Sequence, residues 1–214
     1  MNPVCAMLYS CGVFALNAGA NYQEKKDTWQ AGYLCTMLEN ETHRLRAMEP
    51  HDSKLLFSLE NMPSEWWLGA TMHPIGKEAL VNFASGQHDI WRDLQLRLMV
   101  ETRGADSKTV GAVDLYHLDP RNSRAGIGVV ITENERRQGH AKAGIALLAS
   151  YAFYHLGLHQ LWAEVPGNHA ASLGLFEACG FTKTGHMKDW IRKGDDWVDI
   201  HTMQLIRPDK VSLP

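Results

Sequence analysis

Cysteine is scarce in this sequence, and the few cysteines present follow no regular spacing. The 214 residues include only four, Cys5, Cys11, Cys35 and Cys179, and no two of them form a C-x-x-C pair. A zinc ribbon needs such pairs, and a disulfide framework needs closely spaced cysteines in a small secreted chain. Neither class is indicated, and a reducing, cytoplasmic setting is the simpler expectation.

The beginning of the sequence lacks the basic residues that open a secretory signal. Residues 3–16 are apolar and Ala18-Gly19-Ala20 resembles a cleavage site, but the first basic residue is Lys25. A signal peptide begins with positive charge, and this apolar run is too short to span a bilayer. We therefore predict neither secretion nor a membrane partner.

An excess of positive charge is also missing. Lys and Arg number 21 against 24 Asp and Glu, which gives a net charge of −3. Proteins that hold nucleic acid through its phosphates carry a basic face, so no nucleic-acid partner is predicted. No metal site is predicted either, because His155 and His159 lie four residues apart without a third ligand at helical spacing.

What is present is the composition of a globular protein with room for one well-buried domain. Hydrophobic residues make up 45% and charged residues 21% of the chain. Clear periodicity begins only near Met37, so we predict a domain over residues 37–214. Residues 1–36 are interpreted as an N-terminal extension, either loosely attached, or an upstream extension of the reading frame, or an extra helix packed on the domain.

The order of the expected elements indicates an α+β fold with one crossover. Alternating residues predict strands, and apolar residues three and four apart predict helices. The run from residue 124 to 131 and the run from 160 to 165 are expected to be parallel, joined by a right-handed crossover. The expected strands are 44–48, 94–101, 109–118, 124–131, 160–165, 182–191 and 197–206, and the expected helices are 53–62, 76–83, 141–156 and 170–179.

The stretch Glu135-Arg136-Arg137-Gln138-Gly139-His140-Ala141-Lys142 joins the third strand of this meander to the longest helix. A helix begins with unpaired backbone N–H groups and partial positive charge, so a tight loop there can hold an anion such as a pyrophosphate. Gly139 allows close approach of the backbone. An ordinary strand-to-helix connection explains the same pattern, and the glycines of a dinucleotide or nucleotide-triphosphate loop are missing.

The spacing Arg136-x-x-Gly139-x-Ala141 resembles the (Gln/Arg)-x-x-Gly-x-(Gly/Ala) loop that binds the coenzyme A pyrophosphate in the GNAT family of N-acetyltransferases. The segment from Asn168 to Phe181 resembles the second signature of that family, Asn-x-x-(Ala/Ser)-x-x-(Leu/Ile)-(Tyr/Phe)-x-x-x-Gly-Phe. The two occur in the right order with a helix and a strand between them. The resemblance covers about residues 43–206 and is nearest to the group of spermidine and ribosomal-protein N-terminal acetyltransferases.

This resemblance implies an acyl-CoA N-acyltransferase fold. In such a fold a mixed central sheet, with an antiparallel meander and a splayed pair of parallel strands, has helices on its flanks. It further implies that acetyl-CoA is the co-substrate, and that a neutral amine attacks the thioester directly while both substrates are bound. A homodimer is one assembly open to such a protein. The residues implied to contact the cofactor are Val129, Val130, Arg136, Arg137, Gln138, Gly139, His140, Ala141, Lys142, Asn168, His169, Ser172 and Phe176.

Two departures from the family pattern affect the expected chemistry. Phe176 stands where the family has a Tyr that protonates the departing thiolate, and phenylalanine has no proton to give. Ser172, Tyr151 and Tyr154 are substitutes that the sequence does not rank; a free thiol has a pKa near 8.5, so unassisted departure is tolerable. Counting back from Gly180, the family's Asn falls on His169, so Asn168 and His169 both stay candidates.

The candidates for a catalytic base lie on strands that are expected to flank the acceptor channel. They are Glu101, Asp114 and Glu164, each of which is equally explained as a solvated charge on a strand. In this fold the acceptor pocket is built from variable loops, here residues 61–76, which include Trp66 and Trp67, and the turn at 192–196. The adjacent tryptophans either pack in the interior or wall this pocket.

Three classes of function are compatible with these features. The first is an acetyl-CoA-dependent N-acetyltransferase that acts on a primary amine of a small molecule, such as a polyamine, or of a peptide N-terminus. The second is a catalytically weak CoA-binding module, which the phenylalanine at position 176 motivates. The third is an interaction domain that keeps the fold without the ligand.

Overall fold

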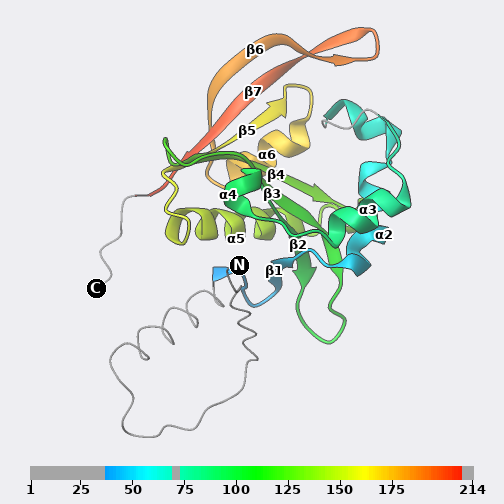
Figure 1. Ribbon diagram of the computed structural model, residues 1–214. Helices are drawn as coiled ribbons and strands as arrows, with labels where there is room; N and C mark the ends of the chain where they lie inside the picture. Colours follow the sequence, from blue (N-terminus) through cyan, green and yellow to red (C-terminus); the bar gives the residue numbers. More distant parts are fainter. Residues whose placement is uncertain (1–36, 69–72, 209–214) are drawn as a thin grey trace, which may run out of the picture. The chain divides into compact units, whose positions relative to one another are not determined.

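A seven-stranded mixed sheet forms the centre of the protein, in the order β1-β2-β3-β4-β5-β7-β6 (Figure 1). Every neighbouring pair is antiparallel except β4 and β5, which are parallel, as the sequence predicts. The strands are β1 (His43–Ala47), β2 (Leu96–Thr102), β3 (Thr109–Asp119), β4 (Arg124–Ile131), β5 (Gln160–Pro166), β6 (Thr182–Lys193) and β7 (Asp196–Ile206).

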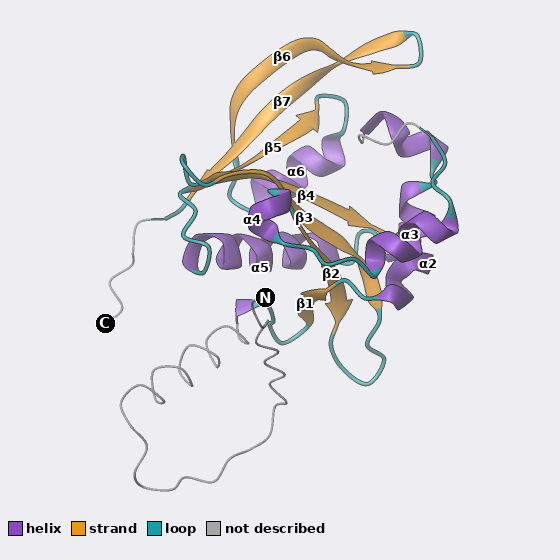
Figure 2. Cartoon of the chain, viewed as in Figure 1, coloured by secondary structure: helices purple, strands orange, loops and turns teal. Residues whose placement is uncertain are grey.

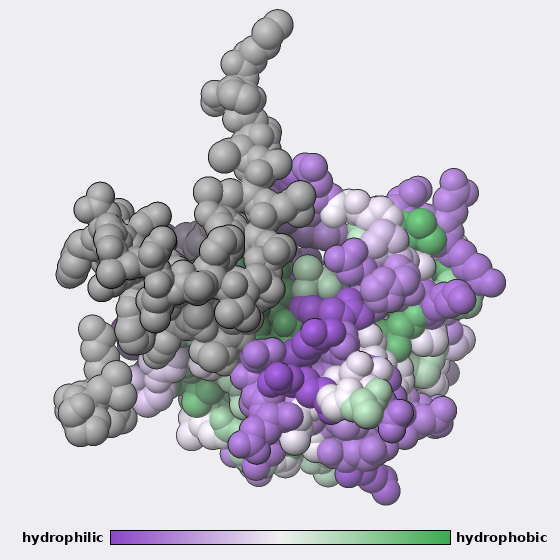
Figure 3. Space-filling view, turned by 90° about the horizontal axis from the view of Figure 1, so that it is seen from below, coloured by the Kyte–Doolittle hydropathy of each residue, from purple (hydrophilic) through white to green (hydrophobic). Residues whose placement is uncertain are grey.

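This computed structural model describes residues 37–68 and 73–208, which belong to the compact unit Leu34–Pro214. The predicted extension, residues 1–36, lies outside the described residues. No helix in these described ranges is long and apolar enough to cross a membrane. In the view of Figure 3, hydrophilic residues predominate over scattered apolar ones on the described surface.

Helices cover both faces of the sheet (Figure 2). The long helix α5 connects the two parallel strands. The helical segments are η1 (Pro50–Asp52), α2 (Ser53–Glu60), η2 (Pro63–Leu68), α3 (Lys77–Ala84), α4 (Ile90–Asp93), η3 (Glu133–Glu135), α5 (His140–Tyr154) and α6 (Ala170–Ala178). The helix predicted over residues 53–62 is shorter in the structure, where α2 ends at Glu60. The two tryptophans lie in η2 instead of an irregular loop. Helix α4 was not predicted; Asp89 caps it by accepting the backbone N–H groups of Trp91 and Arg92.

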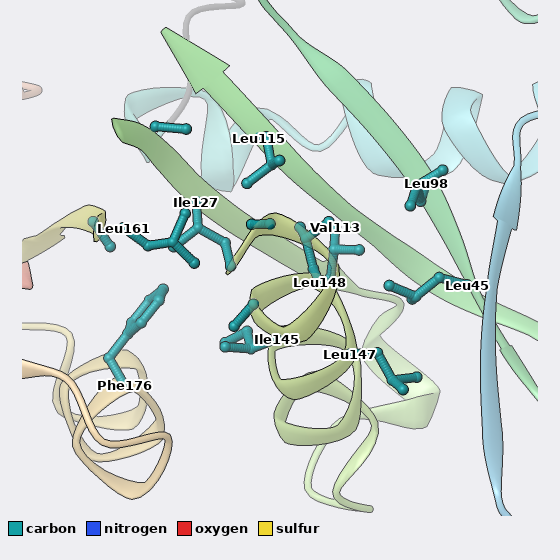
Figure 4. Close-up of a cluster of buried hydrophobic side chains, with 14 of the residues drawn as sticks. Leu45, Leu98, Val113, Leu115, Ile127, Ile145, Leu147, Leu148, Leu161 and Phe176 are labelled. Carbon is teal, nitrogen blue, oxygen red and sulfur yellow. The ribbon is translucent and has the colours of Figure 1, made fainter. Parts of the chain in front are cut away.

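The main core lies between the sheet and α5 with α6. Ile145 and Leu148 of α5 are fully buried against Val113 and Leu115 of β3, and this cluster is drawn in Figure 4. Gly144 lets the helix approach closely, because a Cβ there would lie 3.0 Å from Val113 Cγ1. Truncating such a fully buried leucine or isoleucine to alanine destabilises a domain by about 2–5 kcal/mol.

The opposite face of the sheet is only partly covered. Helices α2 and α3 pack over its β2–β3 side, where Leu56 and Leu80 meet Met99 and Ala112. Strand residues alternate between faces, so Asp114 and Tyr116 of β3 point to the α2–α3 face while Val113 and Leu115 point to α5. Beyond these helices the same face carries a cavity, which Trp162 and Glu164 of β5 and Thr202 and Gln204 of β7 help to line.

Candidate functional site

The two parallel strands separate after a short paired stretch. Only residues 124–126 of β4 pair with residues 160–162 of β5. Beyond Gly126, β4 continues its pairing with β3 as far as Ile131, and β5 continues its pairing with β7 as far as Pro166. A V-shaped gap therefore opens in the sheet, with its apex at Gly126 and Trp162 and main-chain groups along its sides.

The direction of the backbone in β4 decides which of its residues face this gap. The backbone N–H of Thr132 donates to the Val110 carbonyl at 3.0 Å, so residue 132 is directed toward β3. An antiparallel ladder alternates, and the register between Val129 and β3 is regular. Val130 is then also directed toward β3, and Val129 toward the gap. We correct the expectation that both valines offer main-chain groups to a ligand, since only Val129 does.

The loop that follows β4 presents its backbone at the wide end of the V. Residues 136–139 are exposed, and Arg137 and Gly139 adopt left-handed conformations with φ of 64° and 86°. Successive N–H groups in such a turn, next to the first turn of the 15-residue α5, form an anion-binding concavity. A non-glycine residue with this φ is uncommon, and such strain is frequent in ligand-binding loops. The loop fits a pyrophosphate.

The side chains of this loop divide into two groups. Arg137 and Lys142 are exposed and free to meet a phosphate, and Ala141 leaves the first turn of α5 unobstructed. Arg136 is held in place, because its Nε donates to the Ile131 carbonyl at 3.0 Å and its Nη2 to Glu65 Oε1 at 2.7 Å. Gln138 donates to the Asn134 carbonyl. Arg136 therefore anchors the loop to η2, and its predicted contact with a phosphate remains a prediction.

The side chain of His140 does not point toward the ligand side of the loop, so the expected contact of this residue with the cofactor is left to its backbone. Its imidazole is buried, and its Nδ1 lies 2.7 Å from Nε2 of His43 in β1. Burial, and then the neighbouring His140, lower the pKa of His43, so that ring is neutral. The other nitrogen of His140 faces Glu135 at 3.7 Å. The pair fixes the start of α5, and only the backbone of His140 is available to an anion.

The second signature forms the turn and first helical turn after β5. His169 is the N-cap of α6, and its Nδ1 accepts the backbone N–H of Ser172 at 3.2 Å. Asn168 is exposed one residue earlier, in the turn. Of the two candidates, His169 is the N-cap, and it is also the residue on which the family's Asn falls in the count back from Gly180. Ser172 is half-buried in the first turn of the helix.

Phe176 lies in the hydrophobic core instead of on the surface of the V. Its side chain is 5% exposed and packs edge-on against Phe181, with ring centroids 5.1 Å apart. In Figure 4 it points toward the sheet beside Leu161. Contact between this ring and a cofactor remains a prediction that the burial does not favour.

Two of the predicted bases are engaged in ion pairs. Glu101 accepts from Arg44 and Arg46, both at 2.6 Å, at the β1–β2 side of the sheet. Burial opposes ionisation, but these two arginines outweigh it and hold the pKa of Glu101 below its ordinary value. Asp114 accepts from Arg97 at 2.7 Å. Both carboxylates stabilise the sheet, and this geometry does not favour either as a base.

Glu164 is the carboxylate that lies beside the V without such a partner among the described residues. It is exposed on β5, two residues beyond the last pair with β4. It also borders a cavity of about 580 Å³ on the open face of the sheet. The cavity is lined by His117, Asp119, Arg124, Gln160, Trp162, Glu164, Thr184, Thr202 and Gln204.

The loops expected to wall an acceptor pocket approach each other over the same face. Lys193, in the β6–β7 hairpin, places its ammonium 4.3 Å from the centre of the Trp67 ring in η2. A cation held over an indole face in this way contributes about 0.5–1 kcal/mol at an exposed site. Trp66 packs differently, since its Nε1 donates to the Glu60 carbonyl at 2.8 Å.

Sequence reasoning missed Tyr116, which lies at the apex of the V. Its ring lies over Gly126, where a Cβ would be 2.3 Å from Cε2 and 2.5 Å from Cζ of Tyr116. It meets Trp162 edge-on, with centroids 5.3 Å apart. Two features of the sequence could have indicated this position. The alternation in β3 places Tyr116 on the same face as Asp114, and two glycines in β4 leave room for an aromatic ring.

Comparisons with known proteins agree with this geometry. A family model described as an acetyltransferase (GNAT) domain matches residues 43–182. The spermidine N(1)-acetyltransferase of Vibrio cholerae is 24% identical over 166 residues, which cover 76% of this chain and 92% of that protein. The probable N-acetyltransferase YjcK of Bacillus subtilis is 26% identical over 49% of this chain and 59% of its own length. The crystal structure of the Vibrio cholerae enzyme with CoA and spermine has a TM-score of 0.66 at 22% identity, covering 78% and 96% of the two chains.

Proposed function

The chain belongs to the GNAT family of acetyltransferases, and from this premise we propose that it transfers the acetyl group of acetyl-CoA to a primary amine by direct attack while both substrates are bound. The predicted acyl-CoA N-acyltransferase fold and the predicted N-acetyltransferase activity are both confirmed by the comparisons. The observation that carries the proposal is the V between β4 and β5, which opens toward an exposed loop at the start of α5.

Each side of this V has a part in holding the co-substrate. The backbone N–H groups of residues 137–139, with the charges of Arg137 and Lys142, hold the pyrophosphate at the wide end. The main chain of Val129 pairs with the pantetheine arm, in the way that a strand would add to the sheet. The thioester is then directed toward the apex. His169 and Ser172 shape the β5 side of the gap.

The acceptor approaches from the open face of the sheet. Asp119, Glu164 and the indole of Trp162 line the cavity there, and carboxylates and aromatic faces favour a cationic amine. Arg124 pairs with Asp119 at 3.1 Å, so Glu164 carries the uncompensated negative charge of the cavity. A polyamine suits this lining, and the activity of the Vibrio cholerae relative supports that choice over a peptide N-terminus. Glu164 is placed to take the proton that the amine loses.

The proposal is tested by amine-dependent release of the CoA thiol from acetyl-CoA. The purified full chain is assayed with spermidine, amino acids, aminoglycosides and short peptides as acceptors, and a thiol reagent follows the released CoA. The mass of the product is measured by mass spectrometry. We expect thiol release together with a gain of one acetyl group on the amine, and greatest activity with a polyamine. The absence both of turnover and of a thermal shift with CoA would contradict the proposal, because bound ligand must stabilise the native state.

The second candidate is a CoA-binding module with weak catalysis, favoured by the phenylalanine at position 176. Tight binding of CoA with no turnover of any amine would select it. Phe176→Tyr should then raise activity, if the added hydroxyl reaches the sulfur. Because the ring is only 5% exposed, a hydroxyl that finds no partner there destabilises the protein by about 1–3 kcal/mol. A rise in activity without that loss of stability would show that the position faces the ligand.

A further inference from the structure

We propose that Tyr116 is a catalytic residue, whose hydroxyl donates a hydrogen bond to the sulfur of CoA as it leaves. The inference rests on the function proposed above. It addresses the role left vacant by Phe176, which has no hydroxyl and lies in the core. Tyr116 comes from β3, a different part of the fold from α6, where the family pattern has its Tyr.

The position of the Tyr116 ring places its hydroxyl at the apex of the V. Tyr116 is directly opposite Gly126 in the β3–β4 register, and Gly126 is opposite Trp162 in the β4–β5 register. The ring carbon that carries the hydroxyl, Cζ, is the atom that a Cβ on Gly126 would meet at 2.5 Å. The hydroxyl therefore lies above the last residue of β4 that pairs with β5.

The surroundings of this hydroxyl suit a hydrogen-bond donor. Burial, and then the nearby charge of Glu164, raise the pKa of Tyr116 to about 12, so the hydroxyl stays protonated at neutral pH. The backbone N–H of Glu164 opposes this rise of the pKa, as a donor near the phenolic oxygen does. A donor there uses a lone pair and leaves the O–H proton free to point into the gap. The side chain is half-buried and can be reached from the open face.

Because the pKa of Tyr116 is raised to about 12, this residue donates a hydrogen bond and keeps its proton. In the reaction the amine nitrogen attacks the thioester carbonyl carbon, the C–N bond forms, and the C–S bond breaks with its electron pair on sulfur. A thiol has a pKa near 8.5, far below that of Tyr116, so full transfer of the tyrosine proton is uphill. The nitrogen loses its proton to water by way of Glu164, and the thiolate takes a proton from water after it has left.

The test compares Tyr116→Phe, which keeps the ring over Gly126 and removes only the hydroxyl, with Tyr154→Phe as a matched control. Tyr154, one of the substitutes that the sequence offers for the missing acid, is 56% exposed at the last residue of α5, so its side chain is directed into solvent and not into the V. The first measurement is the pKa of the CoA thiol bound to the protein, followed by thiolate absorbance with the desulfo-CoA complex as blank. We expect this pKa to be higher in Tyr116→Phe by about one unit or more, since a hydrogen bond to a charged group is lost. Tyr154→Phe should match the parent protein.

The second measurement is turnover with the best amine of the panel. We expect kcat to fall about 10- to 100-fold in Tyr116→Phe, with KM for acetyl-CoA and the melting temperature unchanged. An unchanged thiol pKa overturns the assignment, whether or not kcat falls. Failure of the proposed function is distinguishable, because the parent protein would then turn over no amine, while the thiol titration still reports on Tyr116.

Discussion

The close contact between Tyr116 and β4 predicts that replacing Gly126, even by alanine, destabilises the protein. A Cβ at position 126 would lie 2.3 Å from Cε2, 2.5 Å from Cζ and 2.7 Å from Cδ2 of the Tyr116 ring. Carbon atoms in contact lie about 3.5–4.0 Å apart, so the ring has to move by more than about 1 Å. The ring is also held edge-on by Trp162, which blocks part of that movement.

Overpacking of this kind destabilises a domain by about 1–3 kcal/mol. The gain expected from replacing a strand glycine by alanine, about 0.5–1 kcal/mol, offsets only part of it. For a domain of this size each kcal/mol lowers the melting temperature by about 2–4 °C. The net loss of about 0.5–2 kcal/mol should make Gly126→Ala melt about 1–8 °C below the parent protein, measured by calorimetry at a fixed protein concentration.

Gly128 supplies the matched control on the same strand and the same face. A Cβ there would find its nearest atom, Cε1 of Tyr116, at 3.7 Å, which is ordinary contact. Gly128→Ala should be neutral or slightly stabilising. In a Tyr116→Ala background the penalty of Gly126→Ala should disappear, and the coupling in that double-mutant cycle isolates the contact. Equal effects of the two glycine substitutions, or a penalty that survives removal of the ring, would refute the steric account.

Two further predictions concern the cofactor loop and the β1–η1 ion pair. Gly139→Ala and Gly157→Ala both place a side chain in a left-handed conformation with open space around it, at φ of 86° and 71°. Both should destabilise the protein by roughly 1–2 kcal/mol, but only Gly139→Ala should raise KM for acetyl-CoA in steady-state assays. Burial of Asp52 opposes ionisation, yet hydrogen bonds from Arg46 and a backbone N–H outweigh it and lower its pKa. The ionised Asp52 therefore contributes its full stabilisation above the unfolded-state pKa of about 3.9, and this stabilisation is lost as the pH falls through the lower folded-state pKa. Urea unfolding measured from pH 7 to pH 3 should show a decrease in the free energy of unfolding. Asp52→Asn should make that decrease smaller.

The elements that sequence reasoning placed correctly carry a repeating pattern within a short stretch. The alternation from residue 109 to 118 and the β-branched run of β4 have the period of a strand, and the fifteen residues of α5 have that of a helix. The glycine at 139 marks the start of α5 in the same local way. Helix α4 has only four residues, so no helical periodicity of apolar residues is visible in it. Only the N-cap residue Asp89 indicates that a helix begins there.

The contacts that sequence reasoning missed join residues far apart in the chain. His43 and His140 are 97 residues apart, and no local pattern indicates that the second is buried against the first. The same holds for Glu101, whose charge looks solvated in sequence but is held by Arg44 and Arg46 of the neighbouring strand. Such partners are set by sheet register, which depends on the packing of the whole domain. The sequence therefore indicates where the loop and the helix lie, but not which distant side chains pack against them.

Register also connects the stability of the apex to its chemistry. The row Tyr116, Gly126, Trp162 crosses three strands at the point where β4 and β5 part. A ring pushed off Gly126 carries its hydroxyl away from the gap, whereas the loop at 136–139 lies at the other end of the V and is untouched. Gly126→Ala should therefore lower kcat with little change in KM for acetyl-CoA, in steady-state assays at saturating amine. A rise in KM with kcat preserved would mean that the apex serves binding of the carrier and not the departure of its sulfur.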